Sequence, residues 1–524
     1  MKSPLFLRCV QVAALALVAS ACSKDEFLDV NTNPNLPLSV PPSVLLTGVQ
    51  ATTSFAVGND LGRVTGLLVQ HMAGIANQPR VYDTYLLRGN FDNQWNNELY
   101  GGTLINSQQI INLTQATSPV YAGYAKILKA YNFALATDLW GDVPYSQALQ
   151  GNLTTGVLQP RFDKQEDIYK GNQTLGIQSL FDLVREGLAD LDKPSQLRPG
   201  ADDLIYFRGS VTNSAAAIVK WKKFGNTLLL KLANTISKKE PALAAAVINE
   251  VVAKGPAAYM SDNSDDAEVP FGTSVGNQNP FYAYNYVNRP DDQMLSQRFL
   301  DSLNRLKDPR IARFFTTTPT PVLTPTPPAA AVNTTGVTTP FGTFTGYDNG
   351  STAPVPVRAN RSRYGPYVVG STGEATVRLV TNFQRAFILA EAALTLGVAV
   401  PGETAQSLFA AGIRASMLKT GLSANDVTTY FTANPRVVTL AGSVERQRNQ
   451  IVTQKWIAWT GNSYEAYNDF RRTGYPKLAI TTNPSSESPT SIPVRLFYPN
   501  SEISANPQIP KPQPSTEVKV WWAQ

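Results

Sequence analysis

The stretch that decides the fold of this chain reads Ala136-Thr137-Asp138-Leu139-Trp140-Gly141-Asp142-Val143-Pro144-Tyr145-Ser146-Gln147-Ala148-Leu149. Apolar and aromatic side chains before and within it recur on one stripe of a helix, at Tyr121, Tyr124, Leu128, Tyr131, Leu135 and Leu139. We expect that helix to end near Trp140-Gly141, because Gly141 can adopt a left-handed cap and Pro144 cannot continue the helical hydrogen bonds. Asp142 and Tyr145 are placed to tie the resulting turn to the next helix.

Stripes of the same kind begin near Pro42 and recur along much of the chain. They run through 216–236, 242–252, 383–396, 405–418 and 444–460. Helices that follow one another in pairs predict a mainly α fold, built as a solenoid or as an irregular bundle.

The first residues indicate export from the cytoplasm. Lys2 and Arg8 give a positive start to an apolar stretch over 5–18, which is the layout of a secretory signal too short to span a bilayer. The stretch closes with Ala19-Ser20-Ala21-Cys22, and small residues before a cysteine are what a lipoprotein signal peptidase accepts. We therefore predict a signal peptide over 1–21 and a lipid on Cys22, with ordinary cleavage nearby as the alternative.

Residues 22–42 are expected to form the lipidated cysteine and an extended tether, because the segment holds the charged run Ser23-Lys24-Asp25-Glu26 and several prolines. The other cysteine, Cys9, is lost with the signal, so the mature chain can form no internal disulfide. The net charge of +6 is small and no long cluster of Lys or Arg is present. We therefore expect no nucleic-acid partner.

Composition divides the mature chain into three parts. Residues 43–255 and 379–524 carry the helical stripes and form the first and second parts of a scaffold, the second ending in an irregular segment. Between them, 256–378 is rich in Gly, Pro, Asn, Thr and Tyr, which predicts a loop-rich insertion on the ligand side, with one helix over about 291–306. The Thr/Pro/Ala tract over 316–340 predicts an extended surface loop, and long loops on a rigid scaffold are where binding sites usually lie.

Catalytic patterns are weak in this sequence. Gly272-Thr273-Ser274-Val275-Gly276 has the spelling of a nucleophile elbow, but no helix pattern follows it and the sole histidine, His71, lies upstream. A single histidine also leaves no zinc set, and His71 is expected to be a partly buried or surface residue of a helix. We expect neither an enzyme nor a cofactor or metal. The leading alternative is a surface glycan-degrading hydrolase, whose two carboxylates would come together only in the fold.

Acidic residues cluster at Asp262, Asp265, Asp266 and Glu268, a composition that could suit calcium. The segment lacks the glycine and the distal glutamate of an EF-hand loop. The sequence therefore favours a solvated acidic turn.

The stretch over 136–149 resembles the signature of the SusD/RagB family, the surface lipoproteins that cap TonB-dependent outer-membrane transporters. A second stretch is similar to another part of that family, reading Gln450-Ile451-Val452-Thr453-Gln454-Lys455-Trp456-Ile457-Ala458-Trp459, then Gly461, then Tyr464-Glu465-Ala466-Tyr467-Asn468-Asp469-Phe470-Arg471-Arg472-Thr473-Gly474-Tyr475-Pro476. Shorter matches follow the family's order at 221–228, 308–310, 390–392 and 495–502. The run from Arg471 to Pro476 indicates a helix end with Gly474 as its cap, and Lys455, Trp456 and Arg471 are expected to pack and pair in the core.

The resemblance implies a mainly α, tetratricopeptide-like helical-pair scaffold with long irregular, loop-rich insertions. It implies that helix pairs dock on a SusC-type TonB-dependent transporter of a bacterium of the Bacteroidota, with the lipid on Cys22 holding the protein on the exterior of the outer membrane. The implied function is capture of an oligosaccharide or an oligopeptide for that transporter.

Two stretches have the composition of a ligand site. Sugars are bound in water by flat aromatic faces, with amides, carboxylates and arginine taking the hydroxyls. The candidate residues are Tyr82, Trp95, Asn96, Asn279, Tyr282, Tyr284, Tyr286 and Arg289. The alternatives are that Trp95 begins the following helix and packs inward, and that the tyrosines line a contact with the scaffold or one face of a strand. The stacking argument favours oligosaccharide, with oligopeptide as the second candidate.

Overall fold

The structure is a computed structural model that describes residues 40–151, 156–319 and 336–524. The predicted signal peptide, Cys22 and nearly all of the tether lie outside these residues, as does most of the Thr/Pro/Ala tract.

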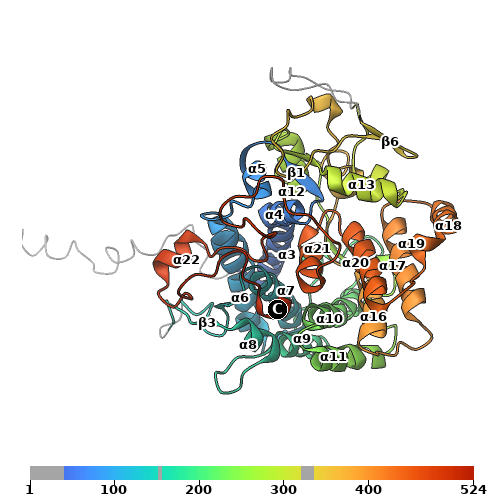
Figure 1. Ribbon diagram of the computed structural model, residues 1–524. Coiled ribbons are helices and arrows are strands. Elements are labelled where there is room, and N and C mark those ends of the chain that lie inside the picture. Colours follow the sequence, from blue (N-terminus) through green and yellow to red (C-terminus); the bar gives the residue numbers. More distant parts are fainter. Residues whose placement is uncertain (1–39, 152–155, 320–335) are drawn as a thin grey trace, which may run out of the picture. The chain divides into compact units, whose positions relative to one another are not determined.

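The larger helices are α3 (Pro42–Gly58), α4 (Asp60–Leu68), η2 (Gln94–Leu104), α6 (Ile105–Thr114), α7 (Pro119–Trp140), α9 (Leu180–Asp190), α10 (Ser214–Ile236), α11 (Pro241–Ala253), α13 (Gln297–Arg305), α16 (Asn382–Thr395), α17 (Ala405–Lys419), α18 (Ala424–Ala433), α20 (Val444–Ala458) and α21 (Ser463–Thr473) (Figure 1). Shorter ones are α5 (Asn77–Asp83), α8 (Gln165–Lys170), α12 (Pro280–Tyr282), η4 (Ala283–Asn288), α14 (Ile311–Phe314), α15 (Pro366–Val369), α19 (Pro435–Val438), α22 (Asn500–Ala505) and η6 (Trp521–Ala523).

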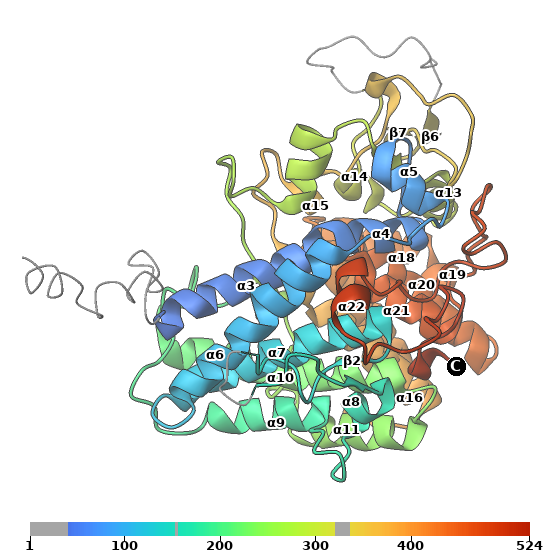
Figure 2. The same ribbon diagram turned by 90° about the vertical axis from the view of Figure 1, so that its left-hand side faces the viewer.

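The helix predicted before Gly141 is α7, and it forms the centre of the first part of the scaffold. Pro119 occupies its first turn, where a missing N–H costs nothing, and Gly141 ends it with φ of +86°. Almost every side chain of α7 is buried, because α6 and α9 pack along it (Figure 2). The backbones of α7 and α9 approach so closely that a Cβ on Gly123 would lie 2.7 Å from the carbonyl oxygen of Gly187. The turn is tied forward as predicted at Asp142, whose carboxylate accepts a hydrogen bond from Gln165 N at the start of α8 at 2.9 Å.

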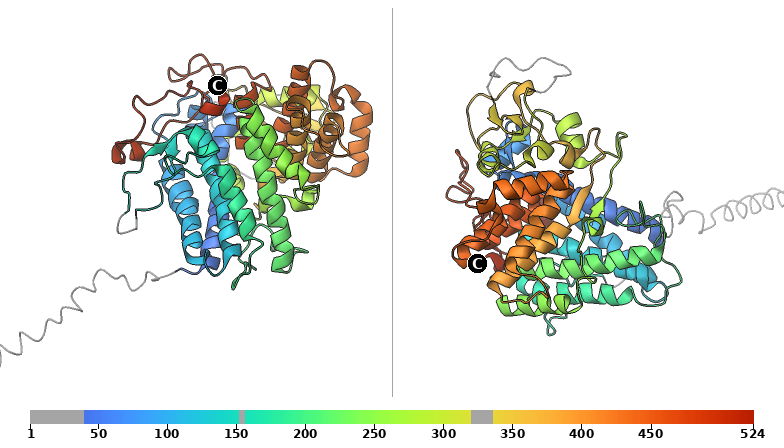
Figure 3. Two further views of the ribbon diagram at one scale, coloured as in Figure 1. Left: turned by 90° about the horizontal axis from the view of Figure 1, so that it is seen from below. Right: turned by 90° about the vertical axis from the view of Figure 1, so that its right-hand side faces the viewer.

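Neighbouring helices pack as pairs through the rest of the scaffold. The pairs are α6 with α7, α10 with α11, α16 with α17 and α20 with α21. They are joined because α9 contacts α10, α10 contacts α16 and α16 contacts α20, and Figure 3 shows these helices side by side from two directions. The mainly α helical-pair scaffold expected from the sequence is therefore present, with the predicted helices at the predicted places.

The segment over 256–378 contains more local structure than predicted. The expected helix is α13, which begins at Gln297 rather than near Asp291, and α12, η4, α14 and α15 are further short helices. Two-stranded antiparallel ladders tie the segment to the scaffold: β1 (Met72–Gly74) with β5 (Gln293–Leu295), and β4 (Ala267–Val269) with β8 (Val377–Val380). The described end of the Thr/Pro/Ala tract is the hairpin of β6 (Val337–Thr339) and β7 (Gly342–Phe344) rather than an extended loop. The remaining ladder joins β2 (Val143–Pro144) to β3 (Phe162–Asp163).

The second signature stretch forms α20 and α21, and its charged residues are buried, all but Arg471 in ion pairs. Lys455 Nζ lies 2.8 Å from a carboxylate oxygen of Asp469, and the guanidinium of Arg472 bonds both oxygens of Glu391 at 2.6 and 2.8 Å. Gly474 ends α21 in the left-handed conformation with φ of +75°. The expectation that this stretch packs and pairs in the core is therefore confirmed. Among the described helices, none combines the length and the apolar character needed to cross a bilayer.

Candidate functional site

The tyrosines over 280–288 lie on a helix, not on a strand. Asn279 begins it, because its side-chain oxygen accepts a hydrogen bond from Phe281 N at 2.9 Å and its amide nitrogen donates to the carbonyl of Ala375 at 2.9 Å. Asn279 is fully buried and caps the helix, so it does not offer the accessible amide that was predicted for a ligand contact. The helix continues from α12 into the π-helical η4, which places Tyr282 and Tyr286 on the same side.

Tyr282 and Tyr286 form a half-exposed aromatic pair. Their rings are stacked with centroids 5.3 Å apart and planes 8° from parallel. The Arg363 guanidinium lies over the Tyr286 ring at 4.3 Å, and the Tyr286 hydroxyl donates to the carbonyl of Tyr364. Beside Tyr282, Gly373 has φ of +106° and its backbone lies so near that a Cβ would be 3.0 Å from the ring. The pair is therefore held in place before any ligand arrives.

Tyr284 points to other partners. The Arg63 guanidinium lies 3.8 Å from its ring centroid, and its hydroxyl donates to Asp292 at 3.0 Å. Arg63 in turn bonds Asp60 at 2.7 Å, and the hydroxyl of Tyr82 donates to the other oxygen of Asp60 at 3.0 Å. The two stretches predicted as a ligand site are thus brought together through Asp60 and Arg63 on α4.

Tyr82 and Trp95 are interior residues. Tyr82 is fully buried and burial raises the pKa of its hydroxyl well above the ordinary range. Trp95 has 2% of its surface exposed, and its ring packs against Trp140 at 5.2 Å and Tyr100 at 4.9 Å. Neither side chain presents a ring face to solvent, so neither offers the stacking surface that was predicted for it. Trp95 packs inward near the start of η2, which was the alternative interpretation.

Asn96 and Arg289 are exposed, as a ligand contact requires. Asn96 donates to the hydroxyl of Ser501 at 2.9 Å. Arg289 follows η4 directly, so it lies at the end of the helix that carries the tyrosine pair.

The sequence did not single out Asp60, Arg63 and Glu98, which the structure places beside the predicted residues. Glu98 is 7% exposed and accepts hydrogen bonds through one carboxylate oxygen from Asn59 at 2.9 Å and Asn93 at 3.2 Å, whereas its other oxygen has no partner among the described residues. Burial raises the pKa of Glu98 to about 7. The spacing of Asp60 and Arg63, three residues apart in an otherwise mostly apolar helix, was the available signal.

Two other sequence expectations need correction. The acidic cluster is only partly solvated: Asp262 is exposed, whereas Asp265 and Asp266 are 1% and 3% exposed and are paired with Lys220, Lys223 and Lys419. These ammonium groups balance the charge of the two carboxylates, and among the described residues no three His, Cys, Asp or Glu side chains gather as a metal site. His71 is fully buried and follows α4 instead of lying within a helix.

Comparison with known proteins identifies the family. A model of SusD-like proteins described as "Starch-binding associating with outer membrane" matches residues 34–499. No curated protein matches the chain. A solved structure named as a chitin-binding protein has 25% identity and a TM-score of 0.73, covering 92% of this chain and 100% of its own. A chitin-binding SusD homologue from Flavobacterium johnsoniae (23% identity, TM-score 0.70, 91% and 98% covered) and a SusD/RagB family protein from Bacteroides thetaiotaomicron (22%, 0.72, 93% and 99%) share the fold. The chain therefore belongs to the SusD-like family of outer-membrane-associated proteins, and it is a binding protein rather than an enzyme.

Proposed function

We propose that this protein is a surface lipoprotein that captures oligosaccharide and delivers it to a SusC-type TonB-dependent transporter. The observation that carries the proposal is the stacked, half-exposed pair of Tyr282 and Tyr286. Family membership supports association with the outer membrane, and a lipid on Cys22 would provide the anchor.

The tyrosine pair has the properties of a sugar platform. The apolar face of a pyranose stacks on an aromatic ring, and ring pairs held in place lose little conformational entropy on binding. Tyr286 is fixed by Arg363 and Tyr364, and Tyr282 by the loop at Gly373. Arg289, at the end of the same helix, can donate hydrogen bonds to hydroxyl groups.

Chitin oligosaccharides are the first ligands to test, because two structures with this fold are named as chitin-binding. An extended oligopeptide is the second candidate, since tyrosine faces also pack against peptide side chains. Neither class requires a cofactor or a bond-breaking group.

The test is a glycan and peptide array on the full-length protein, followed by calorimetric titration of the best ligand. Each of Tyr282→Ala and Tyr286→Ala is expected to weaken binding about tenfold, corresponding to about 1.4 kcal/mol for a lost stacking contact. Phe431→Ala is the matched control, because Phe431 is also half-exposed and lies 4.0 Å beneath a guanidinium, that of Arg414. Full affinity in the Tyr282→Ala, Tyr286→Ala double variant would overturn the site, and binding of peptides alone would replace the ligand class.

Delivery requires a partner in the membrane. We expect the protein to co-purify in mild detergent with a TonB-dependent receptor, through the broad surface of the helical pairs. Isolation without any such barrel would contradict this part of the proposal while leaving glycan capture intact.

A further inference from the structure

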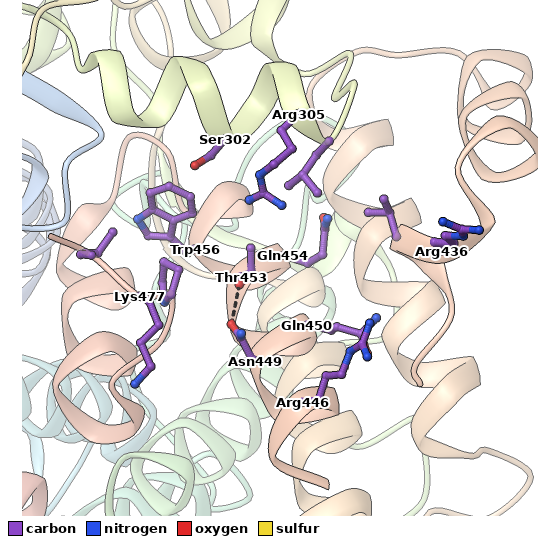
Figure 4. A pocket seen from close by; sticks show the side chains of 14 residues that line it. Ser302, Arg305, Arg436, Arg446, Asn449, Gln450, Thr453, Gln454, Trp456 and Lys477 are labelled. Carbon is purple, nitrogen blue, oxygen red and sulfur yellow. Dashed lines mark hydrogen bonds between the residues drawn. The ribbon is translucent and has the colours of Figure 1, made fainter. Parts of the chain in front are cut away.

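A pocket of about 430 Å³ opens beside α20, apart from the tyrosine pair. Its walls come from separate segments: α13, α19, α20 and the chain that follows α21 (Figure 4). The lining residues are Ser302, Arg305, Leu306, Arg436, Val437, Arg446, Asn449, Gln450, Thr453, Gln454, Trp456, Pro476, Lys477 and Leu478.

The charge of this pocket is uniformly positive. Arg305, Arg436, Arg446 and Lys477 line it, and no Asp or Glu is among the lining residues. None of these cations forms an ion pair with the described residues, although Arg448, on the same helix, contacts both Glu445 and Glu391. Like charges that line one pocket without counter-charges repel one another, and a bound anion would relieve that repulsion.

Neutral donors at the floor of the pocket are fixed by the protein. Gln454 is 2% exposed, and its side-chain oxygen accepts a hydrogen bond from the buried Arg310 guanidinium at 2.7 Å. This bond orients the amide so that its NH2 group is left without a protein partner among the described residues. The side-chain oxygen of Asn449 accepts a hydrogen bond from the Thr453 hydroxyl at 3.0 Å, which leaves its NH2 group as a second donor in the pocket (Figure 4).

We propose that this pocket binds a compact anionic sugar unit, one that carries a carboxylate, sulfate or phosphate group. The arginines and Lys477 would take the anion, and the Asn449 and Gln454 amides would donate to its oxygens or hydroxyls. The volume of the pocket fits a small ligand. Because Gln454 is buried, its amide can donate only to a group that enters the pocket. This inference goes beyond the proposed function, because stacking on the tyrosine pair does not select for a charged ligand, whereas this pocket would.

The experiment titrates the full-length protein with glucuronate, glucose 6-sulfate and glucose 6-phosphate, with glucose, inorganic sulfate and an acidic peptide as reference ligands. We expect the charged sugars to bind at least tenfold more tightly than glucose, and their binding to weaken as salt rises from about 0.05 M to about 0.5 M. Arg436→Gln and Arg446→Gln should each weaken binding about tenfold, the usual range for a charge-assisted hydrogen bond. Arg198→Gln is the matched control, because Arg198 is also exposed and does not line the pocket.

The possible results separate the sources of affinity. Charged sugars that bind no better than glucose, or unchanged affinity in a folded Arg436→Gln, Arg446→Gln double variant, would overturn the site. Inorganic sulfate that binds as tightly as the sugar sulfate would overturn the sugar assignment, and binding confined to an acidic peptide would favour a protein partner instead. Because Tyr282→Ala and Tyr286→Ala should leave this binding unchanged, failure here is distinguishable from failure of the proposed glycan platform.

Discussion

The hydroxyl of Tyr464 donates a hydrogen bond of 2.7 Å to the carboxylate of Asp138, and both side chains are fully buried. The same carboxylate accepts hydrogen bonds from Asn468 at 2.7 Å, Tyr169 at 2.7 Å and Trp522 at 2.9 Å. Asp138 belongs to the first signature stretch, and Tyr464 and Asn468 belong to the second. A single carboxylate therefore joins α7, α8, α21 and the C-terminal segment.

Asp138→Ala should reduce the free energy of unfolding by at least about 3 kcal/mol, because several buried donors would lose their acceptor at once. Urea unfolding followed by circular dichroism measures the change. Asp192→Ala is the control, since its side chain is 69% exposed in a surface pair with Lys222 and should contribute less than about 1 kcal/mol. Equal stability in the two variants would show that the Asp138 contacts do not hold the helices together.

Trp95→Ala should act on stability and not on ligand recognition. The ring packs against Trp140, Tyr100 and Tyr498, and truncating a buried aromatic costs about 3–5 kcal/mol. Thermal unfolding should show a clear fall in Tm, whereas Asn96→Ala next to it, an exposed position, should leave Tm nearly unchanged. A Trp95→Ala protein with the parental Tm and no glycan binding would restore Trp95 to the ligand site.

His71 should make the protein less stable in acid. Burial lowers its pKa to about 3, against about 6.5 in an unfolded chain, so the unfolded state binds more protons between these two pH values. The contribution of His71 to the free energy of unfolding is fully present above pH 6.5. Below that pH the free energy of unfolding falls by about 1.4 kcal/mol per pH unit, or by about 2 kcal/mol at pH 5.

The His71→Gln variant tests this assignment, because His71 is the sole histidine of the chain. The variant loses packing against Phe299 and Trp456 and should be less stable than the parent at neutral pH. Urea unfolding at several pH values should show that the difference between the two proteins narrows as the pH falls. A difference that stays constant between about pH 7.5 and pH 5 would mean that His71 is not the titrating group.

Cys22→Ala should release the protein from the membrane, because Cys22 is the residue that would carry the acyl chains. Cell fractionation and the intact mass of the purified protein measure the effect. Cys9→Ala is the matched control, since Cys9 lies within the predicted signal peptide and should leave anchoring unchanged. Retention of the Cys22→Ala protein in the outer-membrane fraction would contradict lipid anchoring at this residue.

The candidate site was chosen from composition, which is a local property. Aromatic and amide composition selected Tyr282, Tyr286 and Arg289, which the structure leaves partly or fully accessible on or next to one short helix. The same composition selected Tyr82 and Trp95, which are buried. Composition cannot separate these cases, because an aromatic ring has equal chemistry in a core and on a surface. Neighbours distant in sequence decide its exposure, such as Glu502, which accepts a hydrogen bond from Trp95.

The sequence by itself determined the main scaffold helices, the end of α7 and the family. A stripe that repeats every three to four residues, a glycine with positive φ and a proline all act within a few residues, so α7 could be predicted to end at Trp140. Only the tertiary structure decided which polar residues meet. The link from Tyr82 through Asp60 and Arg63 to Tyr284, and the gathering of unpaired cations beside α20, join segments from different regions of the chain. The physical reason is that burial and electrostatic pairing depend on packing between elements, and helical periodicity says which face is buried without saying what covers it.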